Sequence, residues 1–276
     1  MLASFLLSLR EGLEAALIIG IVLGVLLKLK QTDLNKTVWA GAGVAVALSA
    51  IAAVGLNLLG MKFEGRGEQI FEGLAMLLAA GVLTWMIFWM HNTAPNLKAE
   101  IEAKTQKAVY GKGRNALFAL AFLAVFREGI ELALFLLAVQ EASSPLQTLS
   151  GTVLGLAGAA VLGWVLFTST RKLSLRGFFQ VTNVLLIIFA AGMVAYGVHE
   201  LNEAGIIPSV IEHVWDVNHF LNEKSEVGQL LKALTGYNGN PSLTEVIAYL
   251  SYVGGIVTYV FTRKQDVPVS APATAS

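Results

Sequence analysis

An arginine and two glutamates interrupt the first long apolar stretch of this chain, and the same arrangement interrupts another apolar stretch further on. The first copy, REGLE, occupies residues 10–14, and the second copy, REGIE, occupies residues 127–131. Placing one unpaired ionisable group in hydrocarbon costs about 3 kcal/mol. Six such groups in two matching clusters therefore need a compensating role, and we predict that this role is the binding or conduction of an ion.

The composition is typical of a membrane protein. Of the 276 residues, 55% are hydrophobic and only 14% are charged, whereas soluble domains have about 25% charged residues. The formal net charge is zero, which argues against a surface that binds nucleic acid or another polyanion. The chain has no cysteine, so any metal must be held by oxygen or nitrogen ligands.

Seven segments are long and apolar enough to cross a bilayer as helices, because a span needs about 20 mostly apolar residues. We therefore predict an all-α membrane protein with seven transmembrane helices. The first segment is interpreted as a retained span because three charged residues lie where the apolar core of a secretory signal would be. The predicted spans are roughly 4–27, 38–59, 69–91, 115–139, 149–169, 177–199 and 244–262.

The distribution of basic residues predicts the orientation of these spans. With the N-terminus outside and the C-terminus inside, thirteen of the nineteen Lys and Arg residues lie on the inner side and four on the outer side. The positive-inside rule favours this arrangement. We expect a multi-pass protein of the cytoplasmic (inner) membrane. The thirteen inner basic residues are Lys28, Lys30, Lys36, Lys98, Lys104, Lys107, Lys112, Arg114, Arg171, Lys172, Arg176, Arg263 and Lys264.

An internal repeat divides the chain. The third span shares Gln, Ala-Ala-Gly and an aromatic residue with the sixth span at a constant offset of 111 residues. Three spans per repeat would give the two copies opposite orientations, as in many transporters with a binding site at the midplane. The predicted divisions are a first repeat with its inner loop (1–114), a second repeat (115–203), an extracytoplasmic loop (204–243), a seventh span (244–264) and a disordered tail (265–276).

Within the extracytoplasmic loop, apolar residues at helical spacing predict an amphipathic helix on the membrane surface, namely Ile207, Val210, Ile211, Val214 and Trp215.

The spacing of the motif glutamates suits a hard cation. In a helix, acids at i and i+3 lie on one face, about 5–6 Å apart at Cβ, so two converging pairs would offer carboxylate oxygens around one point. Glu72 is a further acid within a span, and five acids with two arginines would leave a formal charge of −3 if all shared one cavity. The predicted metal ligands are Glu11, Glu14, Glu128, Glu131 and Glu72, with Arg10 and Arg127 balancing charge or gating.

Each of these interpretations has a plainer alternative. The motifs could be buried salt bridges that fix helix packing, although a second acid one turn on, repeated in both halves, suits that role poorly. Gln69, Gln180 and Asn183 could form a polar pathway or could equally hydrogen-bond between helices. His213, Asp216 and His219 could form an outer capture site for metal, or they could simply belong to a solvated face.

The doubled Arg-Glu-Gly-[Leu/Ile]-Glu motif, with Phe71-Glu72-Gly73 and Thr84-Trp85-Met86, resembles the oxidase-dependent iron transporter family. This family includes the fungal high-affinity iron permeases and the bacterial EfeU-type permeases, and the resemblance covers nearly the whole chain. It implies iron uptake, with iron handled by the four motif glutamates. It also implies partners: a periplasmic cupredoxin-like protein and a haem peroxidase for bacterial members, and a multicopper oxidase for fungal ones.

We therefore expect an iron permease that imports ferric or ferrous ion, with iron as transported substrate and no permanently bound cofactor. A proton-coupled transporter of another cation or small solute, with the glutamates relaying protons, is the alternative. Acids outnumber arginines in the spans by five to two, which favours a cation. An intramembrane enzyme has little support, because the sequence has no cysteine, no His-Glu-x-x-His and no Gly-x-Ser-x-Gly.

Overall fold

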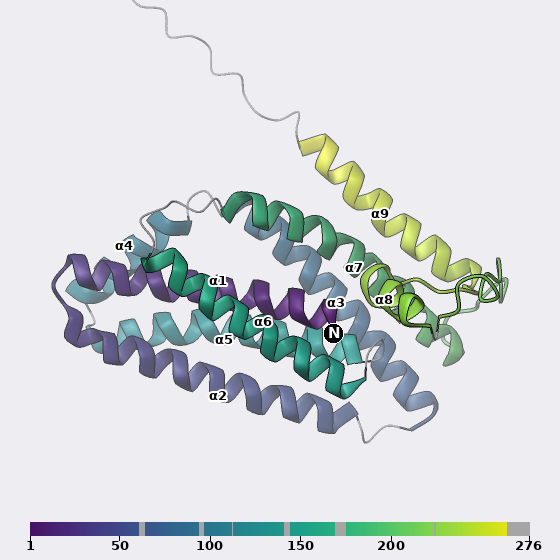
Figure 1. The fold of residues 1–276 in the computed structure, drawn as a ribbon, viewed down its shortest axis with the longest axis horizontal. Coiled ribbons are helices and arrows are strands. Elements are labelled where there is room, and N and C mark those ends of the chain that lie inside the picture. Colours follow the sequence, from purple (N-terminus) through teal and green to yellow (C-terminus); the bar gives the residue numbers. More distant parts are fainter. Residues whose placement is uncertain are drawn as a thin grey trace, which may run out of the picture.

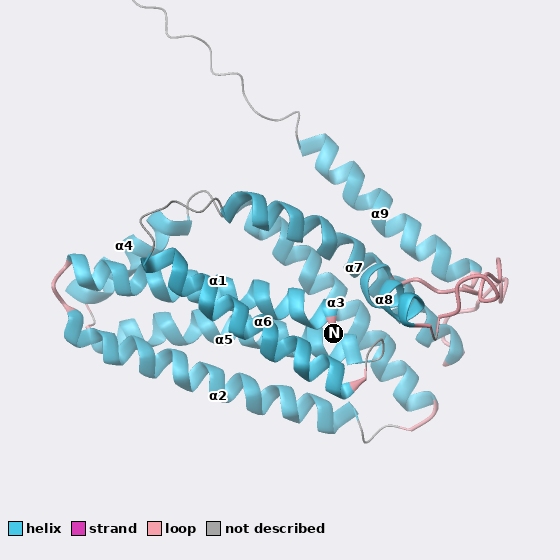
Figure 2. Cartoon of the chain, viewed as in Figure 1, coloured by secondary structure: helices cyan, strands magenta, loops and turns pink. Residues whose placement is uncertain are grey.

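A computed structural model describes residues 1–60, 64–93, 97–111, 113–140, 144–168, 175–223 and 225–263. This part of the chain is almost entirely helical and has no strand (Figure 2). Its elements are α1 (Leu2–Lys28), η1 (Thr32–Leu34), α2 (Asn35–Gly60), α3 (Arg66–Thr93), α4 (Leu97–Tyr110), α5 (Arg114–Gln140), α6 (Pro145–Thr168), α7 (Leu175–Glu203), α8 (Glu226–Thr235) and α9 (Leu243–Arg263).

Each of the seven apolar segments predicted from the sequence coincides with one long helix. Four of these helices, α2, α3, α6 and α7, are long and apolar enough by composition to cross a membrane, and α9 contains a shorter apolar segment. Helices α1 and α5, with 27 residues each, are similar in length to these four, but each carries the three charges of its Arg-Glu-x-x-Glu motif. The fold is thus that of an integral membrane protein.

The long helices pack in pairs (Figure 1). Helix α1 lies along α6, α2 lies along α5, and α3 lies along α7, while α1 and α5 meet in the centre. Two motif glycines allow close approaches, since a Cβ at Gly12 would come within 2.7 Å of Ala159 Cβ, and one at Gly129 within 2.1 Å of Ser49 Oγ. The motif-bearing helices are therefore held tightly against α6 and α2.

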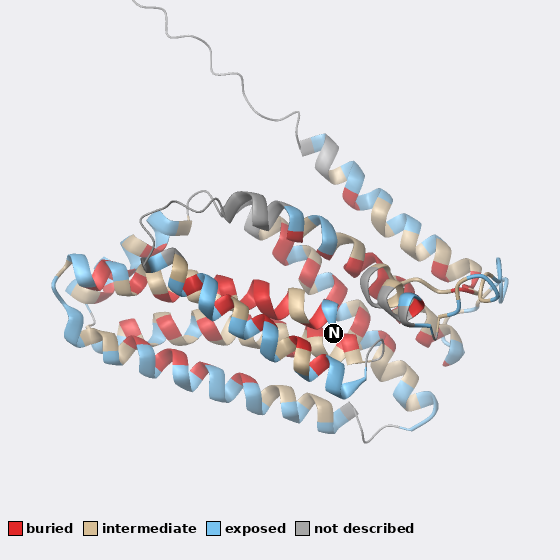
Figure 3. Ribbon diagram, in the orientation of Figure 1, coloured by how far each residue is buried: buried red, intermediate tan, exposed pale blue. Residues whose placement is uncertain are grey.

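Two large apolar clusters fill the interior on either side of the motifs. One is formed mainly by α3, α5 and α7 around Leu83 and Phe135. The other joins α1, α2, α4 and α5 at the end of the bundle where α4 lies, and we call it the α4-end cluster. Many large apolar residues of α2 and α6 are exposed, and Figure 3 shows exposed positions along both helices. Such exposure is expected of surfaces that face lipid. The α4-end cluster contains Ile19, Val22, Leu26, Val38, Ala42, Ala45, Ile101, Ala108, Leu117, Ala121 and Val125.

The predicted amphipathic helix over Ile207–Trp215 is wrong. This segment is irregular, because Pro208 lacks a backbone N–H and disfavours a helical conformation of the residue before it. The helix of this loop is instead α8, where the Ser225 side chain accepts a hydrogen bond from Gly228 N and Gly236 ends the helix in the left-handed conformation. The predicted disordered tail, 265–276, lies outside the described residues.

Helix α9 is joined to the bundle through α7. His199 Nδ1 of α7 lies 3.0 Å from Glu245 Oε1 at the start of α9. The other oxygen of this carboxylate accepts a hydrogen bond from Asn238 Nδ2 at 2.7 Å. Since Glu245 is 3% exposed, these contacts compensate its burial and fix the position where α9 begins.

Candidate metal site

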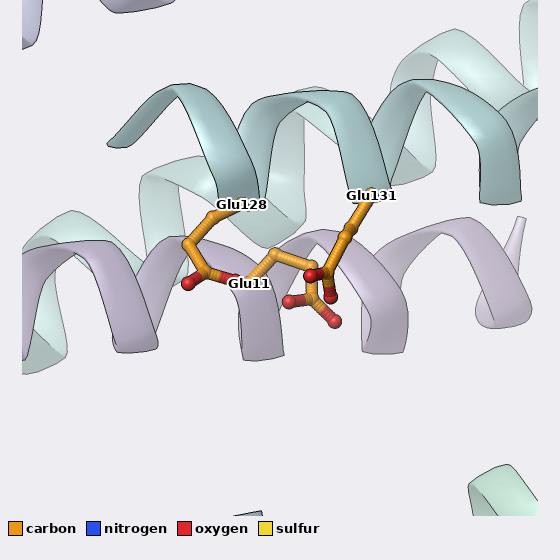
Figure 4. Close-up of side chains that lie close together, drawn as sticks. All are labelled: Glu11, Glu128 and Glu131. Atoms are coloured by element: carbon orange, nitrogen blue, oxygen red, sulfur yellow. The ribbon is translucent and has the colours of Figure 1, made fainter. Parts of the chain in front are cut away.

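Three glutamate side chains from two helices converge near the middle of the bundle. Glu11 of α1 and both Glu128 and Glu131 of α5 point toward one another in Figure 4. Each offers one carboxylate oxygen, and these oxygens all lie within 4.8 Å of one another. All three residues are buried, with exposed fractions of 1%, 4% and 6%. Like-charged carboxylates this close in a buried place repel each other unless a cation or protons lie between them.

Helix geometry explains how two sequence-distant motifs produce this convergence. Glu128 and Glu131 are one turn apart on α5 and face α1 together. Glu11 reaches the same point from α1, whereas Glu14, one turn further along α1, is directed to Arg10, with 3.2 Å between Glu14 Oε1 and Arg10 Nη2. Glu14 therefore belongs to the charged group but not to the group of three, which we call the glutamate cluster.

The two arginines occupy different environments, although their motifs match. Arg10 is fully buried and contacts Glu11 Oε1 at 3.3 Å through Nη1, which also lies 3.1 Å from Met86 Sδ. Arg127 is partly exposed, donates from Nε to Glu131 Oε1 at 2.8 Å, and lies over the rings of Trp85 and Trp89. Since Trp85, Met86 and Trp89 all belong to α3, side chains of this one helix contact both guanidinium groups.

The arginines do not satisfy the glutamate cluster. Among the described residues, the second carboxylate oxygens (Oε2) of Glu11, Glu128 and Glu131 are buried and have no hydrogen-bond partner. An unpaired buried polar atom costs about 1–3 kcal/mol, and more when it is charged. A packing role for the motifs would require paired oxygens. The arrangement instead has the oxygen donors that a hard divalent or trivalent cation prefers.

A cavity of about 280 Å³ opens beside the cluster. Its walls come from α1, α2, α5 and α6, and include Glu11, Glu128 and the hydroxyl-bearing Ser49 and Thr152 among mostly apolar side chains. The Ser49 hydroxyl is buried and has no hydrogen-bond partner in the described part of the chain. An ion at the glutamate cluster would thus have an adjoining space large enough for several water molecules.

The structure does not bring Glu72 to the cluster. Met86, which contacts Arg10, lies 14 residues further along α3 than Glu72, or about 21 Å at 1.5 Å per residue. The sequence-based charge of −3, which counted Glu72 in the same cavity, is therefore wrong. Without Glu72, four acids and two arginines leave −2.

The proposed polar-pathway residues are also separate from the cluster. Gln69 donates to Glu203 Oε2 of α7 at 2.9 Å, which is the interhelical hydrogen bond that we considered as its alternative role. Asn183 Oδ1 is buried without a partner among the described residues, but Asn183 does not line the cavity. Gln180 lies in α7, and its side chain falls outside the described part.

The proposed outer capture residues lie in the irregular segment that follows α7, so they lack the shared helical face on which the prediction rested. His213 Nδ1 lies 3.2 Å from the Asn240 carbonyl oxygen, and Asp216 accepts a hydrogen bond from Asn218 N. His219 packs edge-on against Phe220. In the described ranges, the three residues of the glutamate cluster are the group whose ligand atoms lie close enough together to hold a metal ion, and the outer capture residues do not form a second such group.

Sequence reasoning missed Ser49, Thr152 and Met86. A lone serine or threonine in an apolar helix gives no signal by itself, because its hydroxyl can bond to its own helix. Thr152 does so, donating to the Thr148 carbonyl oxygen at 2.8 Å. Only the packing of α2 and α6 around α1 and α5 shows that these residues line the cavity.

The fold and the site together define an integral membrane protein with a buried cluster of acidic side chains. Comparison with known proteins agrees with this description. The model of the Iron permease FTR1 family matches residues 1–263, and the chain belongs to this family. It is a permease of the iron transport class and not an enzyme.

The chain is similar to curated relatives over its full length. It is 33% identical over 279 residues to the ferrous iron permease EfeU of Escherichia coli O6:K15:H31 (strain 536 / UPEC), covering 100% of this chain and 99% of the relative. It is 31% identical over 277 residues to the ferrous iron permease EfeU of Yersinia pestis, covering 100% and 98%. No solved structure matches.

Proposed function

We propose that this protein imports iron across the cytoplasmic membrane and that the ion passes through the glutamate cluster. The observation that carries the proposal is the approach of Glu11, Glu128 and Glu131 to within 4.8 Å with unpaired buried oxygens. Glu14 completes the charged group, and Arg10 and Arg127 hold the carboxylates in place between ions. Ionisable residues inside a membrane protein that face a common cavity are typical of an ion pathway.

The transported form is Fe²⁺. Four motif glutamates and two motif arginines have a combined formal charge of −2, which one divalent ion neutralises. A trivalent ion would leave an excess positive charge in a buried place, which is unfavourable. The relatives compared above carry the name ferrous iron permease, which supports the same assignment.

The orientation is N-terminus outside, with seven spans formed by α1–α3, α5–α7 and α9. The pattern of helix neighbours supports an inverted repeat. If α1 and α5, α2 and α6, and α3 and α7 exchange places, the α1–α6 pair becomes the α5–α2 pair and the α3–α7 pair is unchanged. Iron would reach the outer side from a periplasmic cupredoxin-like protein and a haem peroxidase, or from an oxidase.

Uptake by purified protein in liposomes tests the function. We expect the wild type to accumulate Fe²⁺ supplied under reducing conditions, and Glu131→Gln and Glu14→Gln to lose this uptake, because each removes a charge with little change of shape. Glu100→Gln is the matched control. Glu100 is exposed and pairs with Lys104 on α4, and such surface pairs contribute about 0–1 kcal/mol.

The same liposome assay compares Fe²⁺ with Fe³⁺ and follows the pH of the liposome lumen. Uptake of Fe²⁺ but not of chelated Fe³⁺ supports the ferrous assignment, and the reverse result would overturn it. Acidification of the lumen in the absence of iron would instead favour the proton-coupled transport of another solute. Normal iron uptake by both glutamate variants would exclude the cluster as the site.

A further inference from the structure

A second cavity, of about 250 Å³, adjoins the cavity beside the glutamate cluster. The two cavities share four lining residues, Ala53, Ala133, Leu136 and Thr152. A shared wall of this size means that they are neighbouring spaces between the same helices, α2, α5 and α6. We call the second one the polar chamber, after its polar lining residues Asn57, Gln140, Thr148 and Thr152.

The polar chamber lies between the glutamate cluster and the end of the bundle where α1 begins. Asn57 and Gln140 stand at the C-terminal ends of α2 and α5, and Thr148 stands in the first turn of α6. Along the helices, Asn57 is 8 residues beyond Ser49 and Gln140 is 12 residues beyond Glu128. At 1.5 Å per residue these separations are about 12 Å and 18 Å.

The chamber contains polar groups that helix packing alone does not explain. Thr148 is 5% exposed, and its hydroxyl oxygen is buried with no hydrogen-bond partner in the described residues. Asn57 Nδ2 donates to Gln140 Oε1 at 2.6 Å across the α2–α5 pair. Side-chain amide and hydroxyl oxygens are neutral ligands for hard cations, and they also replace the water molecules of a hydrated ion.

The opposite direction from the glutamate cluster leads to an apolar part of the bundle. Toward α4, the helices meet in the α4-end cluster, whose members are all apolar and buried. The buried polar groups at this end include Thr105, whose hydroxyl donates to the Ile101 carbonyl oxygen at 2.7 Å, and Asn35 at the start of α2. Neither of these two residues lines the cavity beside the carboxylates or the polar chamber. The cavity beside the carboxylates instead shares its wall with the polar chamber, so the polar side chains next along this space are those of the chamber.

We propose that the polar chamber is a staging site for a hydrated divalent cation, where amide and hydroxyl oxygens replace part of its water before it reaches the glutamate cluster. This proposal rests on the proposed function, because it gives the route by which iron would approach the cluster. Its neutral ligands bind weakly, and a permeation site must release its ion. The glutamates, with their charge, bind the ion more strongly one step further in.

Cysteine accessibility tests this proposal directly, because the wild-type chain has no cysteine. Single variants Thr148→Cys and Thr152→Cys are treated, in right-side-out membrane vesicles, with a membrane-impermeant cationic methanethiosulfonate reagent. Only a thiolate in contact with water reacts. We expect both variants to be labelled, and we expect Fe²⁺ under reducing conditions to slow the labelling of both.

The matched control is Val153→Cys, one residue from Thr152 on the same helix. Val153 is 57% exposed on the outer surface and lines neither cavity, so its thiol should lie in lipid and stay unlabelled. If the Thr152→Cys variant is as unreactive as this control, the chamber is dry and the proposal fails. If labelling occurs but Fe²⁺ gives no protection, the chamber holds water but no cation, and the proposal fails as well.

Transport kinetics give a second measurement. Thr148→Val removes the hydroxyl at nearly constant volume and should raise the KM for Fe²⁺ about threefold to tenfold, the effect of one lost polar contact of about 1 kcal/mol. Thr148→Ser should restore the wild-type KM. Thr105→Val is the control, since Thr105 is also buried but its hydroxyl bonds to its own helix. An unchanged KM in Thr148→Val contradicts the staging site, whereas wild-type protein that moves no iron contradicts the proposed function itself.

Discussion

At the scale of single residues, Glu128 differs from the other members of the glutamate cluster in its partners. Glu11 lies beside Arg10 and Glu131 accepts from Arg127, whereas no ion pair involving Glu128 occurs within the described ranges. Its nearest charged groups in the cluster are two other carboxylates. Under the proposed function, Glu128 is a ligand of the ion and contributes repulsion when no ion is bound.

This difference predicts opposite effects of Glu128→Gln on transport and on stability. We expect iron uptake to fall to background, because one of three converging ligands is lost. The thermal unfolding midpoint of the iron-free protein should rise, because one buried like charge is removed without leaving an arginine unpaired. Uptake assays and thermal unfolding followed by tryptophan fluorescence measure the two effects. Wild-type uptake by this variant would contradict the assignment of Glu128 as a ligand.

The arginines should differ in their tolerance of lysine. Arg10 contacts Glu11 and Glu14 through two different nitrogens, at 3.3 and 3.2 Å, and a single ammonium group cannot reproduce this planar fork. Arg127 makes one such contact and lies over the Trp89 ring at 4.2 Å, where lysine can still provide charge. Initial uptake rates should fall at least about tenfold in Arg10→Lys and less in Arg127→Lys. Equal rates in the two variants would contradict this difference.

At the scale of helices, the close contact between α2 and α5 depends on the absence of a side chain at position 129. A Cβ there would lie 2.1 Å from Ser49 Oγ and 2.5 Å from Ser49 Cβ. Gly129→Ala should therefore push α2 away from α5 and lower the thermal unfolding midpoint, with an expected loss of about 1–3 kcal/mol for overpacking.

A compensating change tests this explanation. Ser49→Gly removes both clashing atoms, so the double variant should regain much of the lost stability, reduced by about 0.5–1 kcal/mol for a second glycine inside a helix. Thermal unfolding of the two single variants and the double variant in detergent measures the coupling. Additive effects of the two substitutions would show that the Gly129–Ser49 contact is not the cause.

The helices themselves could be predicted from the sequence, but the depth of individual residues could not. Apolar runs of about 20 residues define the long helices because the backbone must bond to itself in lipid. Like the motif glutamates, Glu72 is an acid inside an apolar run, so the sequence predicts that it lies beside them. Its separation from the cluster follows from the register of α3 against α1, in which Met86 and not Glu72 contacts Arg10. This register depends on side-chain packing that a single sequence does not encode in any periodic signal.

The glutamate cluster could be predicted for a different reason. Charges inside apolar segments are so unfavourable that two matching copies already require proximity and a shared role. Thr148 and Asn57 gave no such signal, because a hydroxyl or an amide in a membrane helix is common and can bond locally. In the loop before α9, the apolar spacing of Ile207–Trp215 predicts a helix, but Pro208 prevents it.

At the scale of the whole molecule, the proposed inverted repeat places the ends of successive spans on alternate sides of the bilayer. Helix α3 would then cross from the outer to the inner side, and the connections at its two ends would face opposite compartments. The apolar α4-end cluster would close the inner side while the polar chamber communicates with the outer side. Transport in such a protein requires the α4-end cluster to separate at some stage.

Labelling from one side of the membrane tests this topology. Glu64, just before α3, and Tyr110, at the end of α4, are both exposed, and single variants Glu64→Cys and Tyr110→Cys provide one thiol each. In right-side-out vesicles, we expect an impermeant maleimide to label Glu64→Cys at once and Tyr110→Cys only after detergent permeabilisation. Because only α3 crosses the membrane between these positions in the proposed arrangement, labelling of both from the same side would require an even number of crossings. That result would exclude the inverted repeat, and with it the approach of the glutamates from oppositely oriented halves.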